Sequence, residues 1–499
     1  MNTLIFPALL LVCGADDVPA PKLPLGKDTT YVVGPLDKHG YIDYETALNA
    51  EMSKGITPDK NANALLIQMF GPAPEGGDGL PTAYFKWLDV PIPPKDGDYF
   101  LRLTDAPARL GITSEQLTAL YEFLERVAHR PWAAKDCPPL AEWLRANERP
   151  LALAVEAVKR PAFFSPLVSR RKEGEPSQLL GTLIPTQRCR EVGSALAYRA
   201  TLRLGEKKYA AAWADILACH RLGRHLTYGG TLIETFVGLA ICQTASSATL
   251  TYLDRADLTA ADAIRCLKDL RGLRPVAPAA EKIGVVERIM SLDMLQLVRR
   301  GADMKLTAEE RKAIDWTATM RVVNGSCDRV SAAMRREDRA EREKALEAIE
   351  KDFQELRKKG ADEDFQQLLK DAAAGKATGK QIGEHLVGLM MPAFRNVQKP
   401  YDRCEQTERN LRVACALAAY RADAGKYPAQ LADLAPKYLD DVPDDLFSGR
   451  DLIYKPEGKG YLLYSVGPNG TDDGGRGQFD DPPGDDFAVR MPLPEPKKK

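Results

Sequence analysis

Apolar side chains recur at helical spacing through almost all of residues 138–392, and this periodicity constrains the fold more than any other feature of the chain. Residues three and four positions apart lie on one face of a helix, so such a stripe has to be buried against another element. We predict an antiparallel helix pair over Arg188–Leu204 and Lys208–Leu226, joined at Gly205. The clearest stripe lies in the second helix and consists of Tyr209, Ala212, Trp213, Ile216, Leu217 and His220.

Local signals predict further helices. Residues 113–116 form a capping-box pattern, in which a Thr side chain and a Gln three positions later satisfy free backbone N–H groups. Residues 258–262 and 306–310 predict two more helix starts. The run from Met334 to Gly360 mixes charges of both signs at helical spacing, which favours a solvated helix. A partner-binding coiled coil is the alternative, but sustained apolar positions at heptad spacing are missing.

The pattern changes near residue 396. A helix is predicted over Asn396–Asp423, and residues 425–428 break it. Two strand-like segments follow, Leu452–Tyr454 and Tyr461–Val466, with Gly458 as a hairpin signal between them. We therefore predict a mainly α protein, in which a helical-hairpin bundle or short solenoid core carries a small α+β C-terminal module made of a helix and an antiparallel hairpin.

The predicted organisation has five parts. They are a signal peptide at 1–15, a mixed N-terminal region with short helices and Pro/Gly loops at 16–135, an all-helical domain at 136–395, the α+β module at 396–486 and a disordered tail at 487–499. Residues 205–216 resemble the turn and second helix of a tetratricopeptide repeat. The pattern does not recur about 34 residues later, near Gln243, so a bundle is favoured over a solenoid.

The N-terminus resembles a secretory leader. Residues 4–12 form a short apolar core, small residues follow at 13–15, and Asp16 and Asp17 come next. Lys and Arg are missing before the core, so a frayed apolar terminus of a cytoplasmic protein stays the alternative, and lipidation of Cys13 stays open. We expect an exported protein of the periplasm or cell surface. No transmembrane segment is expected after the leader, because Glu234 and Gln243 interrupt the most apolar stretch.

The charge balance limits which partners the protein can bind, and the cysteine spacing indicates whether disulfides form. The 69 Lys and Arg residues balance 70 Asp and Glu residues, which gives a net charge of -1 and argues against a nucleic-acid binder. The nine cysteines are widely spaced and form no CxxC pair, so we expect buried thiols more than a disulfide framework. They lie at positions 13, 137, 189, 219, 242, 266, 327, 404 and 415.

Residues 405–475 carry a resemblance to a known family. Residues 416–428, ALAAYRADAGKYP, are similar to the end of the long helix in the globular part of type II secretion major pseudopilins. Residues 438–449 and the segment from Tyr464 to Gly470 resemble that family's Pro/Asp turn and its hairpin exit. The resemblance implies one long helix packed on a small antiparallel sheet. The remainder of the chain resembles uncharacterised exported helical bacterial proteins.

The resemblance does not extend to the family's filament stem. Pseudopilins begin with a transmembrane helix, whereas the equivalent helix here follows about 390 residues of other protein and carries many charges, which bilayers exclude. We therefore expect the α+β module at 396–486 to serve as a small exported domain, which we call the C-terminal head. Its charged residues before position 410 include Asp402, Arg403, Glu405, Glu408 and Arg409.

The resemblance also implies a calcium site, because the family's loop binds calcium through backbone carbonyls and Asp side chains. Asn469 matches the first Asp position, and Asp480 or Asp481 matches a later one. Asp472 and Asp473 add oxygen donors on the same Gly-rich loop, and hard oxygen ligands suit calcium. A solvated acidic turn without a metal is the alternative, since Asn lowers the ligand charge.

Catalytic motifs are missing from the sequence. Cys219, His220 and His225 are close in sequence, but their helical spacing is poor for a shared metal. Residues 375–381 lack the Ser or Thr of a phosphate loop. We therefore favour a non-enzymatic exported scaffold or interaction protein with protein partners in the cell envelope. The alternative is an envelope hydrolase or other enzyme with an unrecognised active site, for which the aromatic segment Tyr84–Trp87 is a candidate region.

Overall fold

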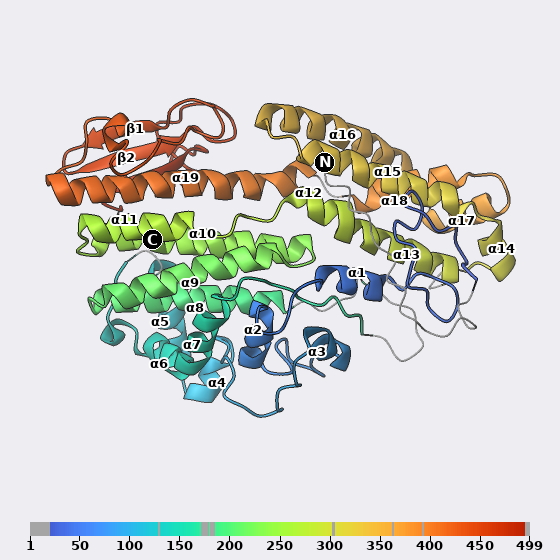
Figure 1. Ribbon diagram of the computed structural model, residues 1–499, viewed down its shortest axis with the longest axis horizontal. Coiled ribbons are helices and arrows are strands. Elements are labelled where there is room, and N and C mark those ends of the chain that lie inside the picture. Colours follow the sequence, from blue (N-terminus) through green and yellow to red (C-terminus); the bar gives the residue numbers. More distant parts are fainter. Residues whose placement is uncertain are drawn as a thin grey trace.

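The computed structural model describes residues 20–127, 130–170, 179, 185–301, 305–361, 364–391 and 394–494. The predicted leader at 1–15 lies outside these residues. The described chain is mainly helical and ends in a small three-stranded antiparallel sheet, which confirms the predicted fold class (Figure 1).

Short helices form the N-terminal part. Helices α2, α6 and α7 bury a core that includes Leu66, Trp143 and Leu151, and this core continues onto α8 and α9. The bounds are α1 (Tyr44–Met52), α2 (Ala62–Phe70), α3 (Thr82–Leu88), α4 (Ala106–Leu110), α5 (Ser114–Val127), α6 (Pro138–Ala146), α7 (Glu148–Ala157), α8 (Thr186–Gly205) and α9 (Tyr209–Thr227).

The predicted helix pair is confirmed as α8 and α9, and α10 (Leu232–Arg255) packs against both. Gly223 of α9 and Gly238 of α10 allow the two backbones to approach closely, since a Cβ on Gly238 would lie 2.6 Å from the Gly223 carbonyl oxygen. Among the described residues, only α10 is long and apolar enough to cross a membrane. However, 67% of its apolar 18-residue stretch is buried inside the protein. A core helix passes the same test, so α10 does not indicate a membrane span.

The helices between residues 279 and 390 occupy the end of the molecule away from the C-terminal sheet, whereas α11 lies beside the long C-terminal helix and shares a core with the sheet (Figure 1). The charged run forms α16, which is solvated on one face and buries Leu346, Ile349 and Phe353 on the other. The bounds are α11 (Ala260–Arg271), α12 (Ala279–Glu281), a π-helical turn (Lys282–Glu287), α13 (Arg288–Arg300), α14 (Ala308–Ala313), α15 (Trp316–Met334), α16 (Arg339–Gly360), α17 (Phe365–Ala373) and α18 (Gly379–Met390).

The long helix α19 (Phe394–Ala424) joins the two ends of the molecule. Its first turns pack with α16, and its later turns contact α10, α11 and the sheet. The sheet has the order β1 (Ile453–Glu457), β2 (Gly460–Ser465) and β3 (Phe487–Met491), with both pairs antiparallel. The predicted hairpin is therefore present as β1 and β2, and β2 is buried along its whole length.

The third strand corrects the predicted start of the tail. Residues 487–491 were expected to begin a disordered segment, but they pair with β2 from Tyr461↔Met491 to Ser465↔Phe487. Val489 and Met491 are buried in the core shared with α19. Burial of this face and the hydrogen bonds to β2 order a segment whose sequence neighbours are rich in Pro and charge.

Candidate metal centre

A long loop leaves β2 at Val466 and returns at Asp486, directly before β3. The β2–β3 pairing brings its two ends together, with Ser465 opposite Phe487. Buried Asp445 holds the start of the loop, because it accepts hydrogen bonds from Ser465 Oγ (2.6 Å) and the Val466 backbone N–H (3.2 Å). Residues far apart on the loop therefore meet beside the sheet.

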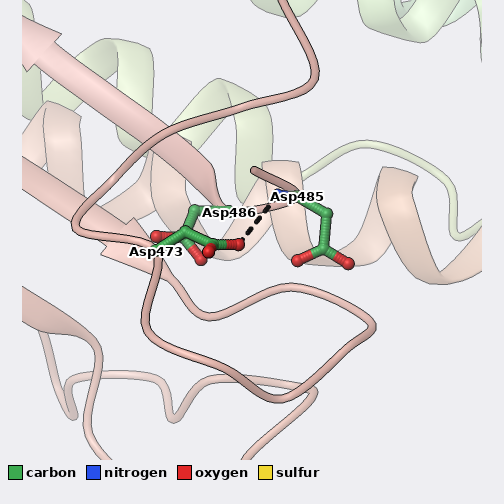
Figure 2. Close-up of side chains that lie close together, drawn as sticks. All are labelled: Asp473, Asp485 and Asp486. Atoms are coloured by element: carbon green, nitrogen blue, oxygen red, sulfur yellow. Dashed lines mark hydrogen bonds between the residues drawn. The ribbon is translucent and has the colours of Figure 1, made fainter. Parts of the chain in front are cut away.

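Three carboxylates converge where the loop closes. Asp473, Asp485 and Asp486 each place a carboxylate oxygen within 4.8 Å of the others (Figure 2). The backbone N–H of Asp485 donates to Asp473 Oδ2 over 3.2 Å, the contact drawn as a dashed line in Figure 2. We name these three residues the carboxylate triad.

Backbone donors orient the triad. The Gly475 N–H donates to Asp486 Oδ2 (2.7 Å), and the Asn469 N–H donates to Asp485 Oδ2 (3.0 Å). Gly467 has a positive φ of 67°, and a Cβ there would lie 2.2 Å from the Asp485 carbonyl oxygen. Glycine is therefore needed at position 467 for the loop to close on itself.

In Asp485 and Asp486, the second carboxylate oxygen receives no hydrogen bond from the described residues. These two atoms, Asp485 Oδ1 and Asp486 Oδ1, are both buried from solvent. Asp486 is 4% exposed. Burial raises the pKa of both carboxyl groups, and the negative charge of Asp473 raises them further. A buried carboxylate oxygen without a partner is costly unless a cation or a proton compensates it.

The predicted metal ligands are divided by the structure. Asp473 belongs to the triad, and Asn469 lies beside it, with its Nδ2 group 3.3 Å from Asp473 Oδ2. Asp472 turns the other way and accepts from the Tyr464 hydroxyl (2.9 Å) and the Gly474 N–H (2.8 Å). Asp480 accepts from the Gly477 N–H (2.9 Å) and, like Asp481, is exposed and lies outside the triad.

Sequence reasoning missed Asp485 and Asp486. The usable signal was their position directly before an alternating segment, Phe487 to Met491, because loop residues at a strand end are held in place by the sheet. The predicted disordered tail begins at residue 487, so no strand is predicted that would hold the two aspartates in place.

The triad suits a hard cation. Three carboxylates from one loop supply oxygen donors and negative charge, which calcium prefers, and the two orphaned oxygens fit that requirement. Arg476 lies 3.6 Å from Asp473 Oδ1 and partly balances the charge. The loop also forms one wall of a cleft of about 440 Å³. The other walls are α10, α19 and β3, and Asp485 and Asp486 line the cleft.

His220, His225 and Tyr84, which lie in the other regions that the sequence suggested, are buried in the core. His220 Nε2 lies 2.9 Å from Thr249 Oγ1, and His225 Nε2 lies 3.2 Å from the Val158 carbonyl oxygen. Burial lowers the pKa of both imidazoles, to about 3 and about 4 respectively. Tyr84 is 1% exposed, and its hydroxyl accepts a hydrogen bond from Asn63 Nδ2 over 2.9 Å.

Comparisons with known proteins identify no similar protein from which a function could be inferred. No family model, no curated protein and no solved structure matches this chain. The resemblance of residues 405–475 to pseudopilins therefore stays a prediction from the sequence.

Proposed function

We propose that this chain is a non-enzymatic exported scaffold whose C-terminal head binds a divalent cation, with calcium as the best-suited ion, and presents the ordered loop to protein partners in the cell envelope. The observation that carries the proposal is the carboxylate triad with its two buried, unpartnered oxygens. Three aspartates in one place repel one another, and a bound cation removes both that repulsion and the cost of burial.

The loop suits a partner contact as well as a cation. Its tip carries Phe479, which is 89% exposed, and large apolar side chains at such exposure are favoured at protein contacts. Phe479 also lines the cleft against α10 and α19. A cation held by Asp485 and Asp486 would stiffen the loop and reduce the entropy that a partner has to overcome on binding.

Calcium titration of the full-length protein tests the site. We expect binding heat in calorimetry and a rise in the Tm of the head, because a ligand that binds only the folded state stabilises it. D486N removes one ligand charge and should weaken binding by about tenfold or more. D481N is the matched control, since Asp481 lies on the same loop, is exposed and stands outside the triad. No heat and no thermal shift with calcium would remove the metal claim.

Fractionation and cross-linking test the scaffold role. We expect the protein in the periplasmic or surface fraction. In the presence of calcium, we expect it to cross-link there to envelope proteins. The F479A substitution, or removal of calcium with a chelator, should lower the cross-linking yield several-fold. A cytoplasmic location, or a cross-linking yield that neither change affects, would contradict the proposed role.

A further inference from the structure

A pair of cysteines lies at the contact between α10 and α19, away from the carboxylate triad. Cys242 of α10 is 2% exposed and Cys404 of α19 is 7% exposed. With Leu239 they form a small buried cluster, against which Phe236, Val276 and Tyr401 pack. All eight cysteines within the described residues are buried free thiols, as predicted.

The two thiols of this pair are packed into one cluster beside a buried arginine. Cys242 and Cys404 belong to the same small buried cluster, and buried Arg224 of α9 places its Nη1 4.0 Å from the Cys404 sulfur. The neighbouring Cys242 thiol and the guanidinium charge lower the pKa of Cys404, whereas the neighbouring Cys404 and burial raise the pKa of Cys242. A thiolate beside a thiol is the arrangement that favours disulfide exchange.

Another cysteine pair provides a comparison within the same protein. Cys266 of α11 and Cys415 of α19 also lie in one buried cluster. Burial raises the pKa of both thiols, to about 12 for Cys415. A fully protonated buried thiol is a poor nucleophile. Cys266 and Cys415 therefore supply a matched control pair, with Cys415 on the same long helix as Cys404.

We propose that Cys242 and Cys404 form an intramolecular disulfide under oxidising conditions and that this bond locks α10 to α19. The oxidant is a small or protein disulfide, such as oxidised glutathione. The Cys404 thiolate attacks one sulfur of the oxidant, forms a mixed disulfide and releases the first thiolate. Cys242 then loses its proton and attacks the Cys404 sulfur, which releases the second thiolate. The two cysteines are oxidised, and the oxidant is reduced to two thiols.

The disulfide would fix the C-terminal sheet and α19 more firmly to the central helices. α19 carries the C-terminal sheet, and α10 belongs to the central helices, so the link would close a long loop of chain between them. Closing a long loop constrains the unfolded state and raises stability. This inference does not depend on the cation proposal, since the cysteines and the carboxylate triad share no residue.

The full-length reduced protein is incubated with oxidised glutathione. A second incubation adds urea at a concentration below the unfolding transition, so that the oxidant can reach the buried thiols. Peptides are mapped by mass spectrometry without reduction. We expect one cross-linked peptide pair containing Cys242 and Cys404, and a dithiothreitol-reversible rise in Tm of about 5 °C. C404S should abolish both effects, whereas C415S should leave the cross-link unchanged.

Two results would overturn the proposal. One is recovery of Cys242 and Cys404 as free, alkylatable thiols after both incubations. The other is a stable glutathione adduct on Cys404 without a link to Cys242. The wild-type peptide map decides the question even if a serine variant fails to fold.

Discussion

At the scale of single residues, glycines decide how closely helices approach, and sequence reasoning assigned one of them a different role. The sequence predicts Gly205 as the joint between two helices, whereas in the structure it is the last residue of α8 and Lys207 takes the positive φ of 58°. Gly205 is needed because a Cβ there would lie 2.1 Å from the Trp132 carbonyl oxygen. That contact crosses more than seventy positions of sequence, so no local pattern could reveal it.

The close crossing of α9 and α10 leads to a prediction at this scale. G238A should destabilise the protein by about 1–3 kcal/mol, because the new methyl group would meet backbone atoms of α9 that cannot move independently. G325A is the matched control, since Gly325 is helical, exposed and has no atom within 4 Å of the added Cβ. That change should be neutral or stabilise by up to about 1 kcal/mol. Chemical denaturation of both variants measures the difference, and equal effects would refute the close-crossing explanation.

At the scale of elements, helix starts were the most predictable feature. Thr113, Thr259 and Thr307 each accept a hydrogen bond from a backbone N–H three positions later, as the local patterns predict. Capping involves only neighbouring residues, so it can be read without the fold. The strand β3 was missed for the opposite reason, because its hydrogen-bond partners lie in β2, more than twenty residues earlier.

The loop between β2 and β3 leads to a prediction about pH. Burial and the charge of Asp473 raise the folded-state pKa of Asp485 and Asp486 above the unfolded value, which is 3.8 for a free Asp. The stability that these groups contribute is therefore present below pH 3.8 and is lost as the pH rises through their folded pKa values.

Without a cation, the Tm of wild-type protein relative to D485N/D486N should fall as the pH rises from about 4 towards neutrality. Asp472, whose pKa the Gly474 N–H and the Tyr464 hydroxyl lower, acts in the opposite sense and is present in both proteins. Thermal melts in metal-stripped buffers test this, and added calcium should abolish the fall. A difference that is flat with pH would contradict the raised pKa values.

At the scale of the whole molecule, the hydrophobic cores do not follow the predicted ranges. Residues near the N-terminus, including Leu23, Val32 and Ile42, are buried in the same cluster as α13, α15 and α18. The Ile42 backbone exchanges two hydrogen bonds with the Gln296 side chain, at 3.0 and 2.8 Å. The N-terminal region at 16–135 therefore contributes to three hydrophobic clusters. Helix α19 contributes both to the core of the helices between residues 279 and 390 and to the core of the C-terminal sheet.

The sequence by itself determined which segments are helical, where several helices begin, that the fold is mainly α, and that a small sheet follows the last helix. These properties depend on spacing and capping within a few residues. Only the tertiary structure decided that β3 completes the sheet, that Asp485 and Asp486 join Asp473, and that Cys242 meets Cys404. Each of these contacts joins residues far apart in the chain, and their distance is set by the packing of whole elements, which no local pattern encodes.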